Sequence, residues 1–233
     1  MNEMNLFGSE EKEKKRNLIH YEGELGVFDY DPKEFEVKCL SGCGDYLHYH
    51  GNGKSVNLPD GCINTRYMFY DCKLPDGFTL GEKFDTSNVV NMESMFAVCR
   101  MPKGFTLGEK FDTSNVTDIS SMFSHCKMPE GFTLGEHFDT SKVVDTAAMF
   151  YHCIIPAGFS LGLNFNTSNV TNMEDMFNSC SLPKDFTLGE KFFISSVTNM
   201  RNMFWLCKYK GIRIYDYFMV RNGKEVIAKL REL

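Results

Sequence analysis

The sequence of 233 residues lacks long apolar runs, a secretion signal and a surplus of positive charge. No stretch approaches the roughly 18 consecutive apolar residues of a membrane-spanning helix. Residues 1–17 contain no apolar core and no small-residue cleavage site, so we expect a disordered leader there, a cytoplasmic location and reduced thiols. The net charge of −6 disfavours nucleic acid as a direct ligand, because phosphate binding needs clustered Lys and Arg.

Motifs of catalysis and cofactor binding are also missing. The sequence contains no G-x-x-x-x-G-K-[ST] phosphate loop, no G-x-G-x-x-G dinucleotide turn and no constellation of paired carboxylates. Tryptophan occurs once, whereas Phe (21) and Met (14) are abundant, which is typical of one motif copied several times. We therefore expect no enzyme activity and no cofactor.

The dipeptide Met-Phe recurs every 27 residues without insertion, and a cysteine follows each of these methionines after four residues. Such a fixed period predicts a repeat solenoid, in which each coil buries its apolar side chains only against its neighbours. The repeated residues are Met68, Met95, Met122, Met149, Met176 and Met203, with Cys72, Cys99, Cys126, Cys153, Cys180 and Cys207.

One unit reads GFTLGEKFDTSNVVNMESMFAVCRMPK. Its Phe-Thr-Leu alternation predicts a short strand over 78–80, followed by a turn at Gly81. The apolar residues of 89–99 are spaced as on one face of a helix, which must end before the proline of the unit. The predicted fold class is therefore an α/β repeat solenoid of 27-residue strand–turn–helix units with β-rich terminal caps. The expected helix N-caps are Ser87, Ser114, Ser141, Ser168 and Ser195.

The repeat divides the chain into three parts after the leader. Residues 18–55 are expected to form an N-terminal β cap, 56–207 a solenoid of one degenerate and five full units, and 208–233 a C-terminal cap. Within the last part, Asn222-Gly223 favours a type I′ hairpin between 218–220 and 226–227. A final helix over 224–232 is the alternative.

The runs FDTSNVTDISSMFSHC, FDTSNVVNMESMFAVC and FNTSNVTNMEDMFNSC resemble the bacterial surface-protein repeat of the BspA-like and mycoplasma type. The resemblance covers residues 56–207. It implies a right-handed, leucine-rich-repeat-like solenoid with a binding role, often at a cell surface.

Cysteine and histidine offer two chemical interpretations. The cysteines of the repeat are expected to be small buried side chains without disulfides, because neighbouring helices pack about 8–10 Å apart. In the N-terminal cap, thiols and imidazoles could supply the four ligands of a zinc ion, with inert thiols and surface histidines as the competing interpretation. The candidate zinc ligands are Cys39, Cys43, His48 and His50.

Two outward surfaces are candidates for binding a partner. The two positions after each Met-Phe vary while the framework repeats, so they are free to determine specificity. The middle residue of each strand should form an outward ladder of hydroxyls. Packing on neighbouring coils and a solvated sheet face are the respective alternatives. The candidate residues are Tyr70, His125, Tyr151, His152 and Trp205 after Met-Phe, and Thr79, Thr106, Thr133 and Thr187 on the strands.

These patterns favour a non-enzymatic solenoid that binds another protein as a scaffold or adaptor. One alternative is a small intracellular inhibitor, encoded by a phage or mobile element, that blocks another macromolecule; the short chain, the missing export signal and the mild acidity suggest it. A second alternative is a zinc-binding protein that uses the N-terminal cap.

Overall fold

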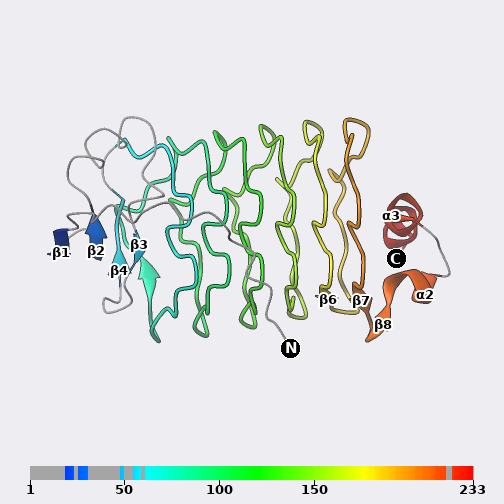
Figure 1. Ribbon diagram of the computed structural model, residues 1–233, viewed down its shortest axis with the longest axis horizontal. Helices are drawn as coiled ribbons and strands as arrows, with labels where there is room; N and C mark the ends of the chain where they lie inside the picture. The colour runs from blue at the N-terminus through cyan, green and yellow to red at the C-terminus, as the bar shows by residue number, and fades with distance from the viewer. Residues whose placement is uncertain are drawn as a thin grey trace, which may run out of the picture.

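The computed structural model describes residues 19–23, 26–30, 48–49, 55–58, 61–218 and 222–232. A row of coils lies side by side along the long axis, between strands at the N-terminal end and helices at the C-terminal end (Figure 1). The N-terminal strands are β1 (Ile19–Gly23), β2 (Gly26–Tyr30) and β3 (His48–Tyr49) in an antiparallel sheet, and β4 (Ser55–Val56), which pairs in parallel with β5 (Thr79–Leu80).

The last coils lead into the C-terminal elements. A second sheet follows the order β6-β7-β8, in which β6 and β7 are parallel and β7 and β8 antiparallel. Among the described residues, neither helix has the length and apolar character that a bilayer span requires. The elements are β6 (Ser181–Leu182), β7 (Lys208–Tyr209), β8 (Ile212–Arg213), α2 (Ile214–Phe218) and α3 (Gly223–Arg231).

Successive coils pair in parallel at an offset of 27 residues. One ladder joins Asn64 to Asn91 and continues in the same register to Asn199. A second ladder contains the pairs Lys73–Arg100 and Lys127–Ile154. Equivalent positions of the motif therefore lie above one another, as the sequence period predicts.

The repeated apolar residues fill the interior of the stack. The Phe96 ring stacks on Phe69 with centroids 5.0 Å apart and on Phe123 with centroids 5.7 Å apart. The methionine and cysteine of each Met-Phe unit are buried as well. Burying one such side chain contributes roughly 1.5–3 kcal/mol, so these columns supply most of the stability that no single coil could have alone.

The segments predicted as helices are successions of tight turns, so the helical part of the predicted unit is wrong. In the coil around Met95, alternate amides close turns onto the carbonyl three residues earlier, for example Met95 onto Met92 at 3.2 Å. The amides between them donate instead to the next coil. Phe96 donates to the Met122 carbonyl at 2.9 Å, and Val98 donates to the Ser124 carbonyl at 2.7 Å.

The spacing of the coils explains this difference. Phe123 stacks on Phe96 and Phe150 with centroid separations of 5.7 and 6.0 Å and nearly parallel rings. Packed α-helices need about 8–10 Å between their axes, so helices cannot stack at this repeat. Successive turns place the same residues inside and let alternate amides bond to the neighbouring coil.

The predicted strands pair only at the start of the stack, where β4 meets β5. Among the described residues, no hydrogen bond joins the backbone of Thr106 to that of Thr133. The adjacent rings of Phe105 and Phe132 are nearly parallel, and their centroids lie 6.3 Å apart. Paired strands lie about 4.7–4.9 Å apart, so the coils are too widely spaced on this face. Strand-like pairing occurs instead on either side of the Met-Phe turns.

The serines predicted as N-caps precede no helix, so that assignment is also wrong. The amide of Ser87 donates to the side chain of Asp85 at 2.9 Å, and Ser114 bonds to Asp112 in the same way at 2.8 Å. These are Asx turns, in which a carboxylate accepts from the amide two residues later. The aspartate before each serine therefore fixes the local chain direction.

The C-terminal cap ends in helix α3, so the hairpin prediction is wrong and the alternative of a final helix is confirmed. The Asn222 side chain accepts the amide of Glu225 at 3.0 Å and donates to its carboxylate at 2.8 Å. Val226, Ile227 and Leu230 join the core of the stack. This reciprocal capping and burial outweigh the turn preference of the Asn-Gly pair.

Replacing Phe123 by Ala should lower the free energy of unfolding by about 3–5 kcal/mol, because the cavity would interrupt a continuous column of rings. Chemical denaturation followed by circular dichroism measures the loss. The exposed Lys127→Ala variant of the same coil is the control and should change stability by at most about 0.5 kcal/mol. Equal losses in the two variants would contradict the packed column.

Replacing Val98 by Asn should raise the free energy of unfolding by about 1 kcal/mol, because a β-branched residue is strained at the positive φ of this position. Val98 has a φ of 61°, in the left-handed region that Asn tolerates. The control is Val144→Asn, at an exposed position outside that region. Thermal unfolding should show a higher midpoint for Val98→Asn only; stabilisation of both variants would argue against backbone strain.

Candidate functional site

The positions directly after Met-Phe form an outward column along the stack. Tyr70 and Trp205 are 40 % and 54 % exposed, whereas the equivalent residues of intermediate coils are small or polar and buried. The fold therefore does not require an aromatic side chain at this position. The buried equivalents are Ala97, Ser124 and Asn178.

The middle of this column contains a cluster of three rings. His125 stacks on His152 with centroids 4.9 Å apart and an angle of 5° between the rings. Tyr151 meets His125 edge-on at 5.2 Å, and the Ser124 hydroxyl lies 2.9 Å from Nδ1 of His125. Nitrogen lone pairs lie in the ring planes, so two parallel imidazoles do not converge on one metal ion. This geometry suits an exposed contact surface.

Burial lowers the pKa of His125, and the neighbouring imidazole of His152 lowers it further. The stacked pair is therefore neutral on the His125 side at physiological pH. A neutral stacked imidazole exposes a flat, weakly polar face, which is the kind of surface that aromatic side chains contact in protein interfaces.

The predicted hydroxyl ladder is outward-facing. Thr79, Thr106, Thr133 and Thr187 are all exposed. Beside them lie two hollows of about 430 and 490 Å³, which share Thr133, Gly135 and Glu136. The hydroxyls thus follow one edge of a groove that extends over several coils.

The cysteines of the repeat are buried and form no disulfide among the described residues. Burial raises the pKa of Cys72 and of Cys126 to about 12, so their thiols stay protonated and weakly nucleophilic. The Cys126 thiol donates to the carbonyl of Phe96, 3.0 Å away in the preceding coil. Hydrogen bonding between coils, and not the separation of helices, describes how these thiols are accommodated.

The proposed zinc ligands Cys39, Cys43 and His50 lie outside the described residues, and His48 is described only as part of β3. Over the described residues, no group of three His, Cys, Asp or Glu side chains is placed to hold a metal ion.

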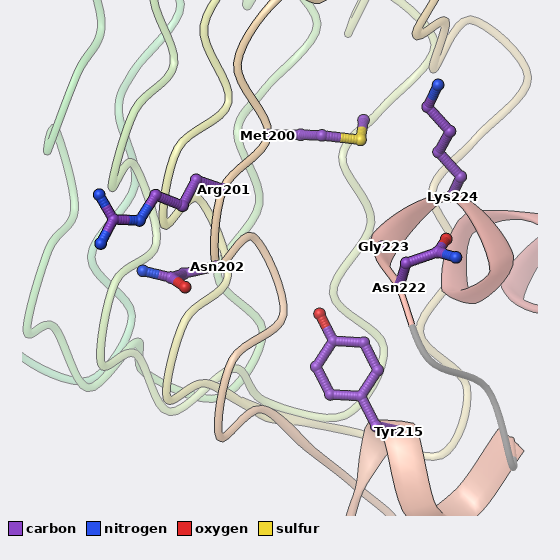
Figure 2. Close-up of a pocket in the computed structure, with 7 residues that line it drawn as sticks. All are labelled: Met200, Arg201, Asn202, Tyr215, Asn222, Gly223 and Lys224. Carbon is purple, nitrogen blue, oxygen red and sulfur yellow. The ribbon is translucent and has the colours of Figure 1, made fainter.

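A third hollow, of about 460 Å³, lies where the last coil meets the C-terminal helices. Figure 2 shows Tyr215 rising from α2 into the space between the last coil and the start of α3. Arg201 and Lys224 stand on its two sides, and burial raises the pKa of Tyr215. Its lining also includes Asn202 and Asn222, a set suited to polar contacts rather than to nucleophilic catalysis.

A buried column of threonines escaped the sequence reasoning. The Thr86 hydroxyl donates to the carbonyl of Asp112 in the next coil at 2.7 Å and accepts its amide at 2.8 Å. Thr140 repeats this arrangement with Asn166. The signal was the invariant Thr of the repeated Asp-Thr-Ser and Asn-Thr-Ser steps, at a position that we treated only as the approach to a helix. These hydroxyls are structural, because they replace backbone pairing between coils.

The chain matches a family model described as "Mycoplasma protein of unknown function, DUF285" over residues 63–155 and 134–229. The two matches together cover well over half of the chain, which therefore belongs to this family. No curated protein and no solved structure matches it. Membership confirms the mycoplasma-type part of the resemblance and the repeat character of the protein.

Stability should fall as the pH drops below about 6.5, the ordinary value for histidine, because the pKa of His125 is lower in the folded protein. The unfolded chain then binds the proton more readily than the folded chain, and the loss continues until the pH reaches the folded pKa. Thermal unfolding midpoints between pH 7.5 and 5.0 measure the effect.

His125→Gln should show a smaller drop in midpoint than the unmodified protein. His152→Gln should also reduce the drop, because it removes the second cause of the shift. The exposed His137→Gln variant is the control and should follow the unmodified protein. If all four proteins lost stability in parallel, the stacked pair would not be the origin of the pH dependence.

Proposed function

We propose that this chain is a non-enzymatic protein-binding module, a scaffold or adaptor built on a leucine-rich-repeat-like solenoid of the BspA-like kind. The observation that supports it is the division of each coil into two kinds of position. Framework residues are buried and nearly identical, whereas the residues after Met-Phe differ from coil to coil and include exposed aromatic side chains. Selection for packing alone would not place Trp205 in water.

The proposed contact surface is the column of Tyr70, Tyr151 and Trp205 with the stacked pair His125 and His152. Tyrosine and tryptophan supply large contact areas at low entropic cost and are enriched among residues that dominate binding energy. The column lies on a rigid frame, because the amides of its turns bond to the next coil. A rigid surface loses little conformational entropy when a partner binds.

The double variant Tyr70→Ser and Trp205→Asn should reduce partner binding at least tenfold, because each residue of a binding hot spot contributes more than about 1–2 kcal/mol. Other coils contain Ser124 and Asn178 at this position, so the variant should fold. Affinity capture from a cell lysate with quantitative mass spectrometry compares the recovered proteins.

The matched control is Val90→Thr with Val144→Thr, which changes two exposed positions where other coils have Thr117 and Thr171. It should recover the same proteins as the unmodified chain. Identical recovery by all three proteins would remove the aromatic column from consideration.

A further inference from the structure

One coil in the middle of the stack has no formally charged residue. Between Asp145 and Glu174 the sequence contains no Asp, Glu, Lys or Arg, although these residues make up 24 % of the chain. The span exceeds one 27-residue period, so it covers a whole coil. Its framework residues, such as Phe159 and Leu161, are buried like their equivalents. Packing of the core therefore does not explain why this coil differs at its surface.

The largest departure is Leu163, which with Asn164 occupies the place of a Glu-Lys pair. Leu163 is 86 % exposed, more than any other large apolar side chain among the described residues. A leucine at an outward position of a regular repeat costs stability in water and indicates contact with a partner. The equivalent pairs are Glu82-Lys83, Glu109-Lys110 and Glu190-Lys191.

Leu163 lines the end of the groove beside the hydroxyl ladder. The floor of the groove is bare where glycine occurs: Gly135 has a φ of 83°, and a Cβ placed there would meet nothing within 4 Å. The charged or titratable side chains that line the two hollows are Glu109, Glu136 and His137, with no Lys or Arg. The groove is therefore acidic at one end and apolar at the other.

The coil spacing on this face matches an extended polypeptide. The rings of Phe105, Phe132 and Phe159 are nearly parallel, so their centroid separations of 6.3 and 6.4 Å measure the step from one coil to the next. In an extended chain, side chains on one face repeat every two residues, about 6.6–6.8 Å apart. Every second side chain of a segment along the stack would thus meet one coil.

The backbone of this face also has hydrogen-bonding capacity. Among the described residues, no backbone hydrogen bond joins Thr106 to Thr133, because the coils are too far apart there. Their exposed hydroxyls and the adjacent peptide groups can therefore bond to the backbone of a ligand. Main-chain bonds with side-chain pockets at alternate positions are the usual way in which proteins bind extended peptides.

We propose that this groove binds an extended polypeptide segment of a partner protein. The segment places an apolar side chain against Leu163 and Lys or Arg beside Glu136 and Glu109. The inference rests on the proposed protein-binding function and names the chemistry of the partner. A peptide fits better than a sugar chain, because the carboxylates favour cations and the hollows offer no phenyl, phenol or indole ring on which a sugar could stack.

A labelled synthetic peptide, Lys-Thr-Lys-Thr-Leu-Thr-Lys, tests the proposal on the full chain by fluorescence anisotropy. It should bind the unmodified protein, whereas a peptide with Glu in place of each Lys should not. The double variant Leu163→Glu with Asn164→Lys restores the pair found in three other coils, so it should fold normally. It should bind the Lys peptide at least tenfold more weakly, since it removes a leucine anchor.

The matched control is Ile154→Lys, which restores the basic residue of the positions of Lys73 and Lys127 at an exposed site that does not line the groove. Its affinity should equal that of the unmodified protein. Unchanged affinity in the Leu163 variant, or equal binding of the Glu peptide, would overturn the inference. Binding of a neutral oligosaccharide without binding of the peptides would also overturn it.

The two proposals fail in distinguishable ways. If the Lys peptide binds the Leu163 variant normally but not the Tyr70→Ser and Trp205→Asn variant, the groove inference falls and the protein-binding function stands. The same holds if no peptide binds while the unmodified chain still captures a protein that the aromatic variant loses. If neither peptide binding nor such capture occurs, both proposals fall.

Discussion

The structure depends on backbone amides that donate to the next coil of the stack. In the turns around each Met-Phe, every second amide reaches a carbonyl 26 residues further along the chain, as Phe96 does with Met122. The remaining amides close tight turns within the coil. This alternation holds two residues of each coil in the left-handed region and stacks the phenylalanine rings at less than about 6 Å on this side. It therefore sets both the backbone conformation and the core.

The period and the buried residues could be predicted from the sequence, because burial depends only on which positions repeat. The local conformation could not. The apolar residues from Val89 to Cys99 fit one face of a helix, but consecutive turns bury the same residues. The distance between coils decides between them, and that distance results from packing of the whole stack. At Asn222-Gly223, capping by Glu225 and burial of the helix likewise override a local turn preference.

The candidate site was predictable where it depends on variation within the repeat. Tyr70 and Trp205 differ from their equivalents in sequence, and both are exposed. The groove was not predictable, since it arises from bare glycine at Gly135 and from a coil spacing too wide for strand pairing. Its apolar end at Leu163 is visible in the sequence only after the outward position of that residue is known.

Strict register also determines how such a chain can change its length. Because donors and acceptors in neighbouring coils are matched at a constant offset, deletion or duplication of 27 consecutive residues within the stack joins equivalent positions and preserves every contact type. Any other change of length shifts all later phenylalanines away from their partners. Genes of this kind are therefore expected to gain and lose whole coils, and a neutral coil such as the one around Leu163 could be moved along the molecule as a unit.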